Sequence, residues 1–456
     1  MDTSRRRYLK LLAGVSVGVI ALASEACRGS AATPAPTSGT APTSPAAAAT
    51  SAASAATSSV ASAPAGATQA PAVSSGAKYP DAGISDTEIR IGDSYSYTGP
   101  NAPFGQALPP AVKAYFQYLN EEKGGVNGRQ LNWISYDDGY DPAKALANVR
   151  RAVEQDNAFL IAFDLGTPMA QAVLPYLTGK GLPYFLPGTS ASNFDDPKQF
   201  PTLIMAGPSY YANAKVLGQY VAQTWPGKKV GMLQQNGDPG PDFLNGFKAG
   251  LGNQVSNLVA VETALPSDPS VDAQVQHLKD AGAEVWFNQA PAKQAVLGLQ
   301  AAYKLGWQPQ ILMGTTNNNA QSVMAVAGPE ATKGAITPVT AKDPSDPQWA
   351  NDPAMKEYKD IVSKYQPKTN LNDGPTLQGF QSAKVLAEAL TRMKEPTRKA
   401  FVDAVREMQG YSTNLEYPGI TWNGSTTSNF MLTQAQLSKW DAERWTPFGS
   451  VLDSRK

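Results

Sequence analysis

The stretch AFLIAFDLGTPMAQAVLPYL, residues 158–177, decides the fold. Its first six residues form a short apolar run that is typical of a strand buried on both faces of a parallel sheet. Thr167-Pro168 follows, and a capping hydroxyl with proline at the first helical position predicts a helix that runs to Leu177. A buried strand that passes at once into a helix is the repeating unit of a parallel α/β sheet.

The same rhythm extends in both directions from this stretch. The first series predicts strands at 88–95, 131–136, 158–163, 183–186 and 202–206, with helices at 109–122, after Asp141 and after Thr167. A second series predicts strands at 229–234, 257–262, 284–288 and 310–313, with helices at 242–251, 271–281 and 292–305. Two successive series indicate an α/β protein with two doubly wound parallel-sheet lobes. Three later helices, at 354–364, 376–393 and 397–409, must join lobes already begun.

The first 27 residues have the composition of an export signal. Ser4-Arg5-Arg6-Arg7-Tyr8-Leu9-Lys10 precedes an apolar run of thirteen residues, from Leu11 to Ala23. That run is shorter than the roughly 20 residues that a membrane-spanning helix needs, so it indicates a signal peptide. The basic string resembles the twin-arginine export signal, with a generic arginine-rich secretory leader as the alternative.

Cys27 is the single cysteine of the chain and ends this leader, where bacterial lipoproteins carry their acylated cysteine. Ser24 and Glu25 depart from the usual pattern before such a cysteine, and Ser24-Glu25-Ala26 is an alternative cleavage site without lipidation. Residues 28–78 follow as an Ala/Ser/Thr/Pro segment, free of acidic and aromatic side chains from 29 to 77. We expect a disordered linker there, which would serve as a leash for a domain above a membrane.

Composition excludes several classes of protein. Residues 1–27 contain four basic and two acidic residues, and their removal leaves 34 Lys and Arg against 36 Asp and Glu, a net charge of −2. A nucleic-acid partner is therefore not expected. His277 is the single histidine, so a His/Cys metal site is nearly excluded and a Ser-His-Asp triad would need His277 itself. No phosphate-binding glycine loop follows a predicted strand, and no cofactor is expected.

A series of short motifs carries a family resemblance from about Asp86 to Trp445. In order they are 89–92 (IRIG), 98–100 (TGP), 124–129 (GGVNGR), 136–142 (YDDGYDP), 166–168 (GTP), 187–190 (PGTS) and 421–423 (TWN). In this order and spacing the chain resembles the solute-binding proteins of branched-chain amino acid ABC transporters. The resemblance implies a type I periplasmic binding fold, with the ligand between two lobes joined by three crossover segments.

The resemblance also implies a division of the chain and a function. Lobe 1 would comprise residues 79–206 and 339–416, and lobe 2 residues 207–338 and 417–456, with crossings near Gly207, Pro338 and Tyr417. The protein would be a monomer that captures a small-molecule ligand, such as an amino acid, amide or organic acid, and delivers it to ABC permease subunits. No catalytic residues are expected. A sensory protein that reports to a receptor is the alternative, and a secreted enzyme a more distant one.

The first lobe supplies the better-defined part of the expected site. Ligands of open parallel sheets bind beyond the carboxyl ends of the strands, where helix N-termini present free amides. Thr167 stands at such a helix start, and Thr189 and Ser190 follow the strand at 183–186. By the resemblance these residues hold the ligand head group, and Phe104 covers it. A simple helix cap at Thr167 and a core aromatic at Phe104 are the alternatives.

The second lobe departs from the family. Its candidate contacts are Tyr211, Asn288, Gln289, Thr315 and Thr316. For the adjacent pair Tyr210-Tyr211, packing at the hinge between the lobes is the alternative to a place in the cleft. Amino-acid binders of the family place an acidic residue after the strand that corresponds to 310–313, whereas residues 314–319 here read GTTNNN. An ammonium group without a counter-charge would be costly to bury, so a free amino acid is disfavoured. Asp137, Asp138 and Asp141 are candidates for a metal site, but a turn at the strand end followed by a helix cap is the favoured interpretation.

Overall fold

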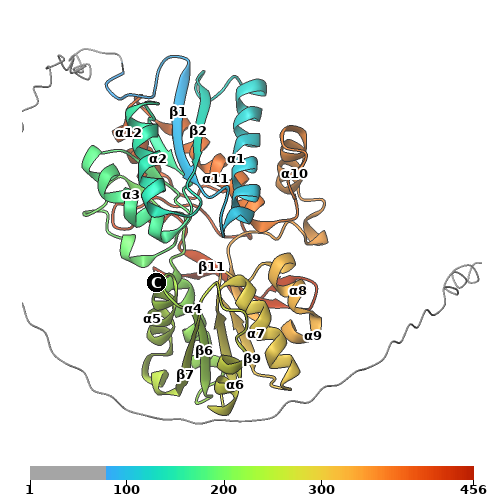
Figure 1. The fold of residues 1–456 in the computed structure, drawn as a ribbon. Helices are drawn as coiled ribbons and strands as arrows, with labels where there is room; N and C mark the ends of the chain where they lie inside the picture. Colours follow the sequence, from blue (N-terminus) through green and yellow to red (C-terminus); the bar gives the residue numbers. More distant parts are fainter. Residues whose placement is uncertain (1–78, 456) are drawn as a thin grey trace, which may run out of the picture. The chain divides into compact units, whose positions relative to one another are not determined.

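The computed structural model describes residues 79–455, and the leader, Cys27 and nearly all of the linker predicted from the sequence lie outside the described residues. The described part contains two α/β lobes, each built around its own sheet (Figure 1). This is the fold class that the alternating strands and helices predicted. In residues 79–455 no helix is long and apolar enough to span a membrane.

The first lobe contains a parallel sheet of five strands in the order β2-β1-β3-β4-β5. Its strands are β1 (Glu88–Tyr95), β2 (Gln130–Asp137), β3 (Leu160–Ala162), β4 (Tyr184–Phe185) and β5 (Leu203–Ile204). Its helices are α1 (Ala102–Glu122), α2 (Pro142–Glu154), α3 (Thr167–Lys180), η1 (Ser192–Phe194), η4 (Pro347–Trp349), α10 (Pro353–Tyr365), α11 (Gly374–Arg392) and α12 (Arg398–Glu407).

Helices cover both faces of this sheet because neighbouring strand residues point to opposite sides. Leu160 packs in one core with Val112 of α1 and Phe380 of α11. Ile161, the next residue, packs in a second core with Val173 of α3. The apolar run at 158–163 is therefore buried on both faces, as a strand in a doubly wound sheet must be.

The second lobe contains an eight-stranded sheet in which β12-β11-β10-β9-β8-β6-β7 are neighbours and β13 also pairs with β11. The strands are β6 (Val230–Gln235), β7 (Leu258–Ala264), β8 (Val285–Gln289), β9 (Gln310–Met313), β10 (Ile336–Val339), β11 (Gln434–Trp440), β12 (Trp445–Pro447) and β13 (Leu452–Asp453). The helices are α4 (Tyr210–Thr224), α5 (Gly240–Leu251), η2 (Gly252–Asn257), α6 (Asp272–Asp280), α7 (Ala292–Lys304), η3 (Ala320–Met324), α8 (Ala325–Ala327) and α9 (Pro329–Thr332).

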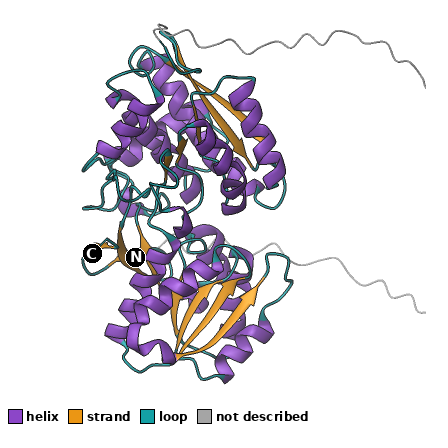
Figure 2. Cartoon of the chain, turned by 90° about the vertical axis from the view of Figure 1, so that its left-hand side faces the viewer, coloured by secondary structure: helices purple, strands orange, loops and turns teal. Residues whose placement is uncertain are grey.

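The pairing of β11 with β10, β12 and β13 is antiparallel, whereas β6 to β10 run parallel. Helices again cover both faces of the parallel part (Figure 2). Phe287 packs with Phe243 and Phe247 of α5 on one face, and Trp286 packs with Leu299 of α7 on the other.

The third crossing between the lobes lies near Thr433, not near Tyr417 as the sequence suggested. Tyr417, Trp422 and Leu432 belong to a core of the first lobe. Isolated bridges from Trp422 to Tyr411 and from Phe430 to Met205 join this segment to the first lobe. The resemblance implied that residues 417–456 belong to the second lobe, but the side chains of this segment are buried in the first lobe, and β11 begins at Gln434.

Helices α4 and α5 pack closely because glycines line their contact. A Cβ on Gly246 would lie 2.1 Å from the carbonyl oxygen of Tyr211, and one on Gly250 would lie 2.2 Å from that of Lys215. Both contacts are with backbone, which side-chain rotation cannot relieve. This pair of helices carries Tyr210 and Phe243, so its spacing determines where those aromatic rings lie.

We expect Gly246→Ala to destabilise the protein by about 1–3 kcal/mol, since overpacking forces backbone shifts. Gly179→Ala is the matched control, because Gly179 lies in helix α3 and a Cβ there would have no neighbouring atom within 4 Å, and alanine should stabilise a helix at such a position by roughly 0.5–1 kcal/mol. Thermal melting of both variants measures the difference. A melting temperature of Gly246→Ala at or above that of the wild type would contradict the prediction.

Candidate ligand site between the two lobes

The carboxyl edges of the two sheets face each other. Ser192, which follows β4, donates from its backbone nitrogen and hydroxyl to Asp242 of α5, at 2.9 and 2.5 Å. Gln171 of α3 donates to Asp238, which follows β6, at 3.3 Å. Asn319, which follows β9, donates to Asp373 before α11 at 3.1 Å. Every one of the three contacts joins loops or helix starts beyond strand ends, where open α/β sheets bind ligands.

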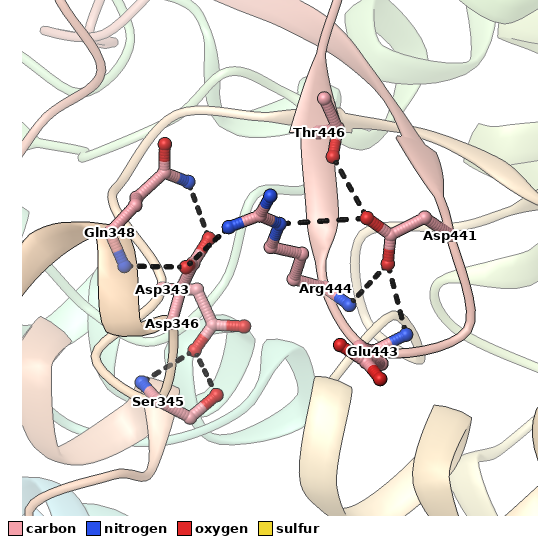
Figure 3. Close-up of polar contacts among 8 residues, drawn as sticks. All are labelled: Asp343, Ser345, Asp346, Gln348, Asp441, Glu443, Arg444 and Thr446. Atoms are coloured by element: carbon pink, nitrogen blue, oxygen red, sulfur yellow. Dashed lines mark hydrogen bonds and ion pairs between the residues drawn. The ribbon is translucent and has the colours of Figure 1, made fainter.

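A further contact between the lobes involves Arg444, in the turn between β11 and β12 (Figure 3). Its guanidinium lies 3.5 Å from the buried carboxylate of Asp346 in the first lobe and 3.5 Å from Asp441 in its own turn. The next residue, Trp445, donates from its indole nitrogen to the Asn318 carbonyl oxygen at 2.9 Å. The β11–β12 turn thus links the first lobe to the loop after β9.

Thr167 and Thr189 lie together, as the sequence predicted. Their side-chain oxygens are 2.8 Å apart, and the residues are only 5% and 4% exposed. The two loops are joined by backbone pairing, because Gly188 donates to the Asp164 carbonyl at 2.5 Å and Gly166 donates to the Gly188 carbonyl at 3.1 Å. One hydroxyl of the pair donates to the other, so the remaining hydroxyl proton, together with the amides at the helix start, can donate to a carboxylate or another polar group.

Tyr140 lies against this pair of loops, and the sequence analysis missed it. A Cβ on Gly166 would lie 2.9 Å from the Tyr140 hydroxyl oxygen, so the glycine is needed for the ring to fit. Burial is the main cause of the raised pKa of Tyr140, a hydrogen bond with Asn101 lowers it, and the charges of Asp138 and Asp238 raise it further. The sequence identified residues 138–142 only as a turn and helix start.

The other first-lobe candidates lie nearby. Phe104 is 40% exposed in the first turn of α1, so it is not the core aromatic that was the alternative. Ser190 accepts from the Tyr210 backbone nitrogen through its carbonyl, at 2.8 Å.

Each of the three aspartates considered for a metal has other partners: Asp137 accepts from Thr98, Asp138 from Ser96, and Asp141 caps α2. No metal-binding group of His, Cys, Asp or Glu is found among the described residues.

The structure distinguishes between the adjacent residues Tyr210 and Tyr211. Tyr210 stacks on Phe243 with ring centroids 5.0 Å apart. Burial raises the pKa of Tyr210 to about 12, although interactions with the backbone of Ser190 and the side chain of Thr189 lower it. Tyr211, the predicted residue, lines a different cavity of about 470 Å³ with Ser209 and Arg455. Tyr210 therefore takes the place expected for Tyr211, because the first turn of α4 points only one of the two rings toward Thr189.

In the second lobe the side chain of Asn288 serves the backbone. It donates to the Ala295 carbonyl at 3.2 Å and accepts from the Ala290 nitrogen at 3.3 Å. Both polar atoms of the side chain are therefore used to close the turn from β8 to α7. Its neighbour Gln289 points to the opposite face and donates to Thr316, at 2.5 Å. Thr315 is half-buried and Thr316 is exposed in the loop after β9.

Three buried carboxylates lie directly beneath the first-lobe loops. Asp138 accepts from the Tyr140 nitrogen at 2.7 Å, and Asp164 accepts from the Ser94 nitrogen at 3.2 Å. Asp93 accepts from the Ser135 hydroxyl at 2.6 Å. Burial is the largest cause of the raised pKa of both Asp93 and Asp164: that of Asp164 rises to about 7, and that of Asp93 rises well above its usual value.

His277 provides no support for a catalytic triad. Its ring is exposed on α6, and its Nδ1 lies 2.5 Å from a carboxylate oxygen of Glu262 on β7. Within residues 79–455 no hydroxyl forms a hydrogen bond with this ring. Since this is the single histidine of the sequence, a nucleophile activated by histidine has no base in this structure.

Two doubly wound lobes, three crossings between them and facing carboxyl edges define the class of two-lobed solute-binding proteins. A family model described as a periplasmic binding protein matches residues 88–442. The chain therefore belongs to the periplasmic binding protein family, in its branched-chain amino acid type, as the motifs predicted. Members of this family are exported solute-binding proteins of ABC importers and not enzymes.

Among curated relatives, Leu/Ile/Val-binding protein homolog 3 of Brucella melitensis is 23% identical over 362 residues, which cover 79% of this chain and 93% of that protein. The leucine-, isoleucine-, valine-, threonine-, and alanine-binding protein of Pseudomonas aeruginosa is 22% identical over 332 residues, 72% of this chain and 85% of that protein.

Two solved structures share the fold. A branched-chain amino acid ABC transporter protein from Thermus thermophilus with bound valine has a TM-score of 0.73 and 19% identity, covering 81% of this chain and 97% of that one. A solute-binding protein from Rhodopseudomonas palustris in complex with 3,4-dihydroxy benzoic acid has a TM-score of 0.65 and 19% identity, covering 81% and 98%.

The raised pKa values of Asp93 and Asp164 predict a pH dependence of stability. Because these folded-state values lie above the unfolded value near 3.9, the folded protein binds more protons than the unfolded chain between about pH 4 and 7, and stability falls as pH rises through that interval. Asp93→Asn removes one of the two buried acids, so the fall in melting temperature between pH 5 and pH 8 should become shallower. Asp280→Asn, on the exposed end of α6, is the control and should keep the wild-type slope. Equal slopes in all three proteins would contradict the raised pKa values.

Proposed function

We propose that the protein is the substrate-binding component of an ABC importer that captures a small polar or carboxylate-bearing solute between its two lobes and delivers it to a membrane permease. The observation that supports this most directly is the pair of buried hydroxyls of Thr167 and Thr189, 2.8 Å apart at the start of α3. A buried polar pair at a sheet edge that faces another lobe is the arrangement expected of a head-group site.

The ligands of the relatives support a carboxylate in this place. The Thermus structure is described with bound valine and the Rhodopseudomonas structure with 3,4-dihydroxy benzoic acid, and both molecules carry a carboxylate while the rest of each differs. In this chain Thr167 and Thr189 would donate to the carboxylate, and the exposed ring of Phe104 together with Tyr140 would cover the ligand. Ser190 would contribute through its loop.

Capture would operate by closure. The lobes contact each other through separate hydrogen bonds such as Ser192 with Asp242 and through the Arg444–Asp346 ion pair, which is partly exposed and so contributes less than about 1 kcal/mol. Weak contacts of this kind leave the lobes free to separate. A ligand that bonds to both edges favours the closed state by its difference in affinity for the two states, and the closed state would be the form that the permease recognises.

Thr167→Val tests the head-group site. Valine keeps the shape of threonine but cannot donate, so affinity for the solute should fall by about tenfold to a hundredfold, the effect of one hydrogen bond to a charged group. The solute is first identified by a thermal-shift screen of metabolites, in which binding raises the melting temperature, and affinity is then measured by calorimetry.

Thr391→Val is the matched control for this experiment. Thr391 is a first-lobe threonine whose hydroxyl donates to the Ala387 carbonyl within α11 at 2.8 Å, and its replacement should leave affinity unchanged. Equal affinity of the Thr167 variant and the wild type would remove Thr167 from the site. A screen without any stabilising solute would overturn the proposed function itself.

We also propose that the protein is exported through its arginine-rich leader and held at the outer face of the cytoplasmic membrane by acylation of Cys27, working as a monomer at the end of the linker 28–78. Cys27→Ser should then release the protein from washed membranes into the soluble fraction, because the lipid is the attachment. Immunoblots of the two fractions measure the change. A wild-type protein that is itself entirely soluble would contradict the anchor.

A further inference from the structure

Two glutamines lie side by side near the carboxyl ends of two neighbouring strands of the second lobe. Gln234 of β6 and Gln289 of β8 are register partners in the parallel sheet, so their side chains point to the same face. They are only 8% and 1% exposed, yet the side-chain oxygen of each has no hydrogen-bond partner. Neither residue is needed to close a turn, in contrast to Asn288.

Gly314, which follows the neighbouring strand β9, leaves space for the side-chain amide of Gln289. Asn288 is paired with Met313, so Gln289 lies level with Gly314. A Cβ on Gly314 would lie 1.1 Å from the side-chain oxygen of Gln289. Any residue other than glycine would displace the amide, which therefore occupies a place that the chain leaves open at the end of β9.

Asn317 adds a third acceptor and fixes the backbone around Gln289. Its side-chain nitrogen donates to the carbonyl oxygens of Asn288 at 3.1 Å and of Ala290 at 2.9 Å. These two acceptors determine the orientation of the amide, because only its nitrogen can donate. The Asn317 side-chain oxygen is consequently a true acceptor, and it is fully buried without a partner.

A continuous path of contacts leads from the glutamines to the hydroxyl pair of the first lobe. Phe287, two residues before Gln289 and on the same face, packs against Phe243 with centroids 6.2 Å apart. Phe243 stacks on Tyr210, and the Tyr210 backbone nitrogen donates to the carbonyl of Ser190, the residue after Thr189. Gln289 also bonds to Thr316, and Asn319 of the same loop, which includes Asn317, contacts Asp373 of the first lobe. These acceptors and the two threonines therefore belong to the same region between the lobes.

Buried acceptors without donors are unfavourable, and a bound solute that donates hydrogen bonds would relieve this. An ammonium group would donate, but it would be buried without a compensating charge. Residues 314–319 contain no carboxylate, and among the described residues no carboxylate forms a hydrogen bond with Gln234, Gln289 or Asn317. Asp242 and Asp238 bond to Ser192 and Gln171 of the first lobe instead. Uncharged donors suit these three amides.

We infer that the solute carries a hydroxyl or amide group that donates to Gln234, Gln289 and Asn317, at the opposite end from a carboxylate held by Thr167 and Thr189. The protein is then a binder of hydroxylated or amide-bearing organic acids and discriminates against the corresponding amino acids. This inference rests on the proposed function and names the solute class for the same site.

Matched solutes that carry a carboxylate at one end and differ only in the group at the other end test the class: 4-hydroxybutyrate against 4-aminobutyrate, 6-hydroxyhexanoate against 6-aminohexanoate, and 4-(hydroxymethyl)benzoate against 4-(aminomethyl)benzoate. Calorimetry with the full chain should show the hydroxyl member binding at least tenfold more tightly in one or more pairs. Tighter binding of the amino member, equal binding of both, or binding of none would overturn the inference. The proposed function would survive the first two outcomes, since a solute would still be captured.

Two substitutions of Gln289 test whether its amide determines the preference for the hydroxyl member of each pair. Gln289→Glu keeps the size of the side chain, still accepts from Thr316 and supplies a negative charge, so it should weaken the hydroxyl member by tenfold or more and strengthen the amino member. Gln289→Met removes the acceptor without adding charge and should weaken the hydroxyl member about tenfold at a similar melting temperature. If Gln289→Met lowers the melting temperature but leaves affinity unchanged, the amide serves the fold alone and the inference is wrong.

Discussion

The backbone pairing that continues β3 and β4 beyond their last strand residues is the constraint on which the proposed site depends. Leu165 and Gly188 form a bridge, and hydrogen bonds on either side of it join Asp164, Gly166 and Gly188. Because the two loops are paired like strands, the side chains of Thr167 and Thr189 come within hydrogen-bond distance of each other. The pairing also fixes the direction of the helix that starts at Thr167, and Gln171 of this helix contacts Asp238 of the second lobe.

The buried carboxylates beneath these loops show a conflict between stability and position. Burial raises the pKa of Asp164, which lowers the stability of the fold near neutral pH, yet the backbone of Asp164 holds Gly188 in the site. Asp138 holds the Tyr140 nitrogen. Buried polar groups are tolerated when their hydrogen bonds are made, and most of the oxygens here have donors such as Ser94, Ser96 and Tyr184. Among these three carboxylates, the oxygen without a donor is Oδ1 of Asp93.

Local patterns in the sequence were sufficient for the order of strands and helices and for the first-lobe hydroxyls, because a cap, a proline and an apolar run act over a few residues. They were insufficient where the outcome depends on distant partners. Residues 417–432 are apolar enough for either lobe, and only the core that accepts Trp422 decides between them. The choice between Tyr210 and Tyr211, or between Asn288 and Gln289, depends on which face of an element a residue occupies, and a shift of one position reverses it.

The two edges of the site differ in chemistry, and this difference has a consequence for closure. The first-lobe edge offers donors, from hydroxyls and a helix start, whereas the second-lobe edge offers amide oxygens of Gln289 and Asn317 that lack donors. A solute with an acceptor at one end and a donor at the other satisfies both edges only when it touches both at once. Since each unsatisfied buried group opposes closure, the empty protein gains little by closing, and the solute supplies the difference in free energy that favours the closed state.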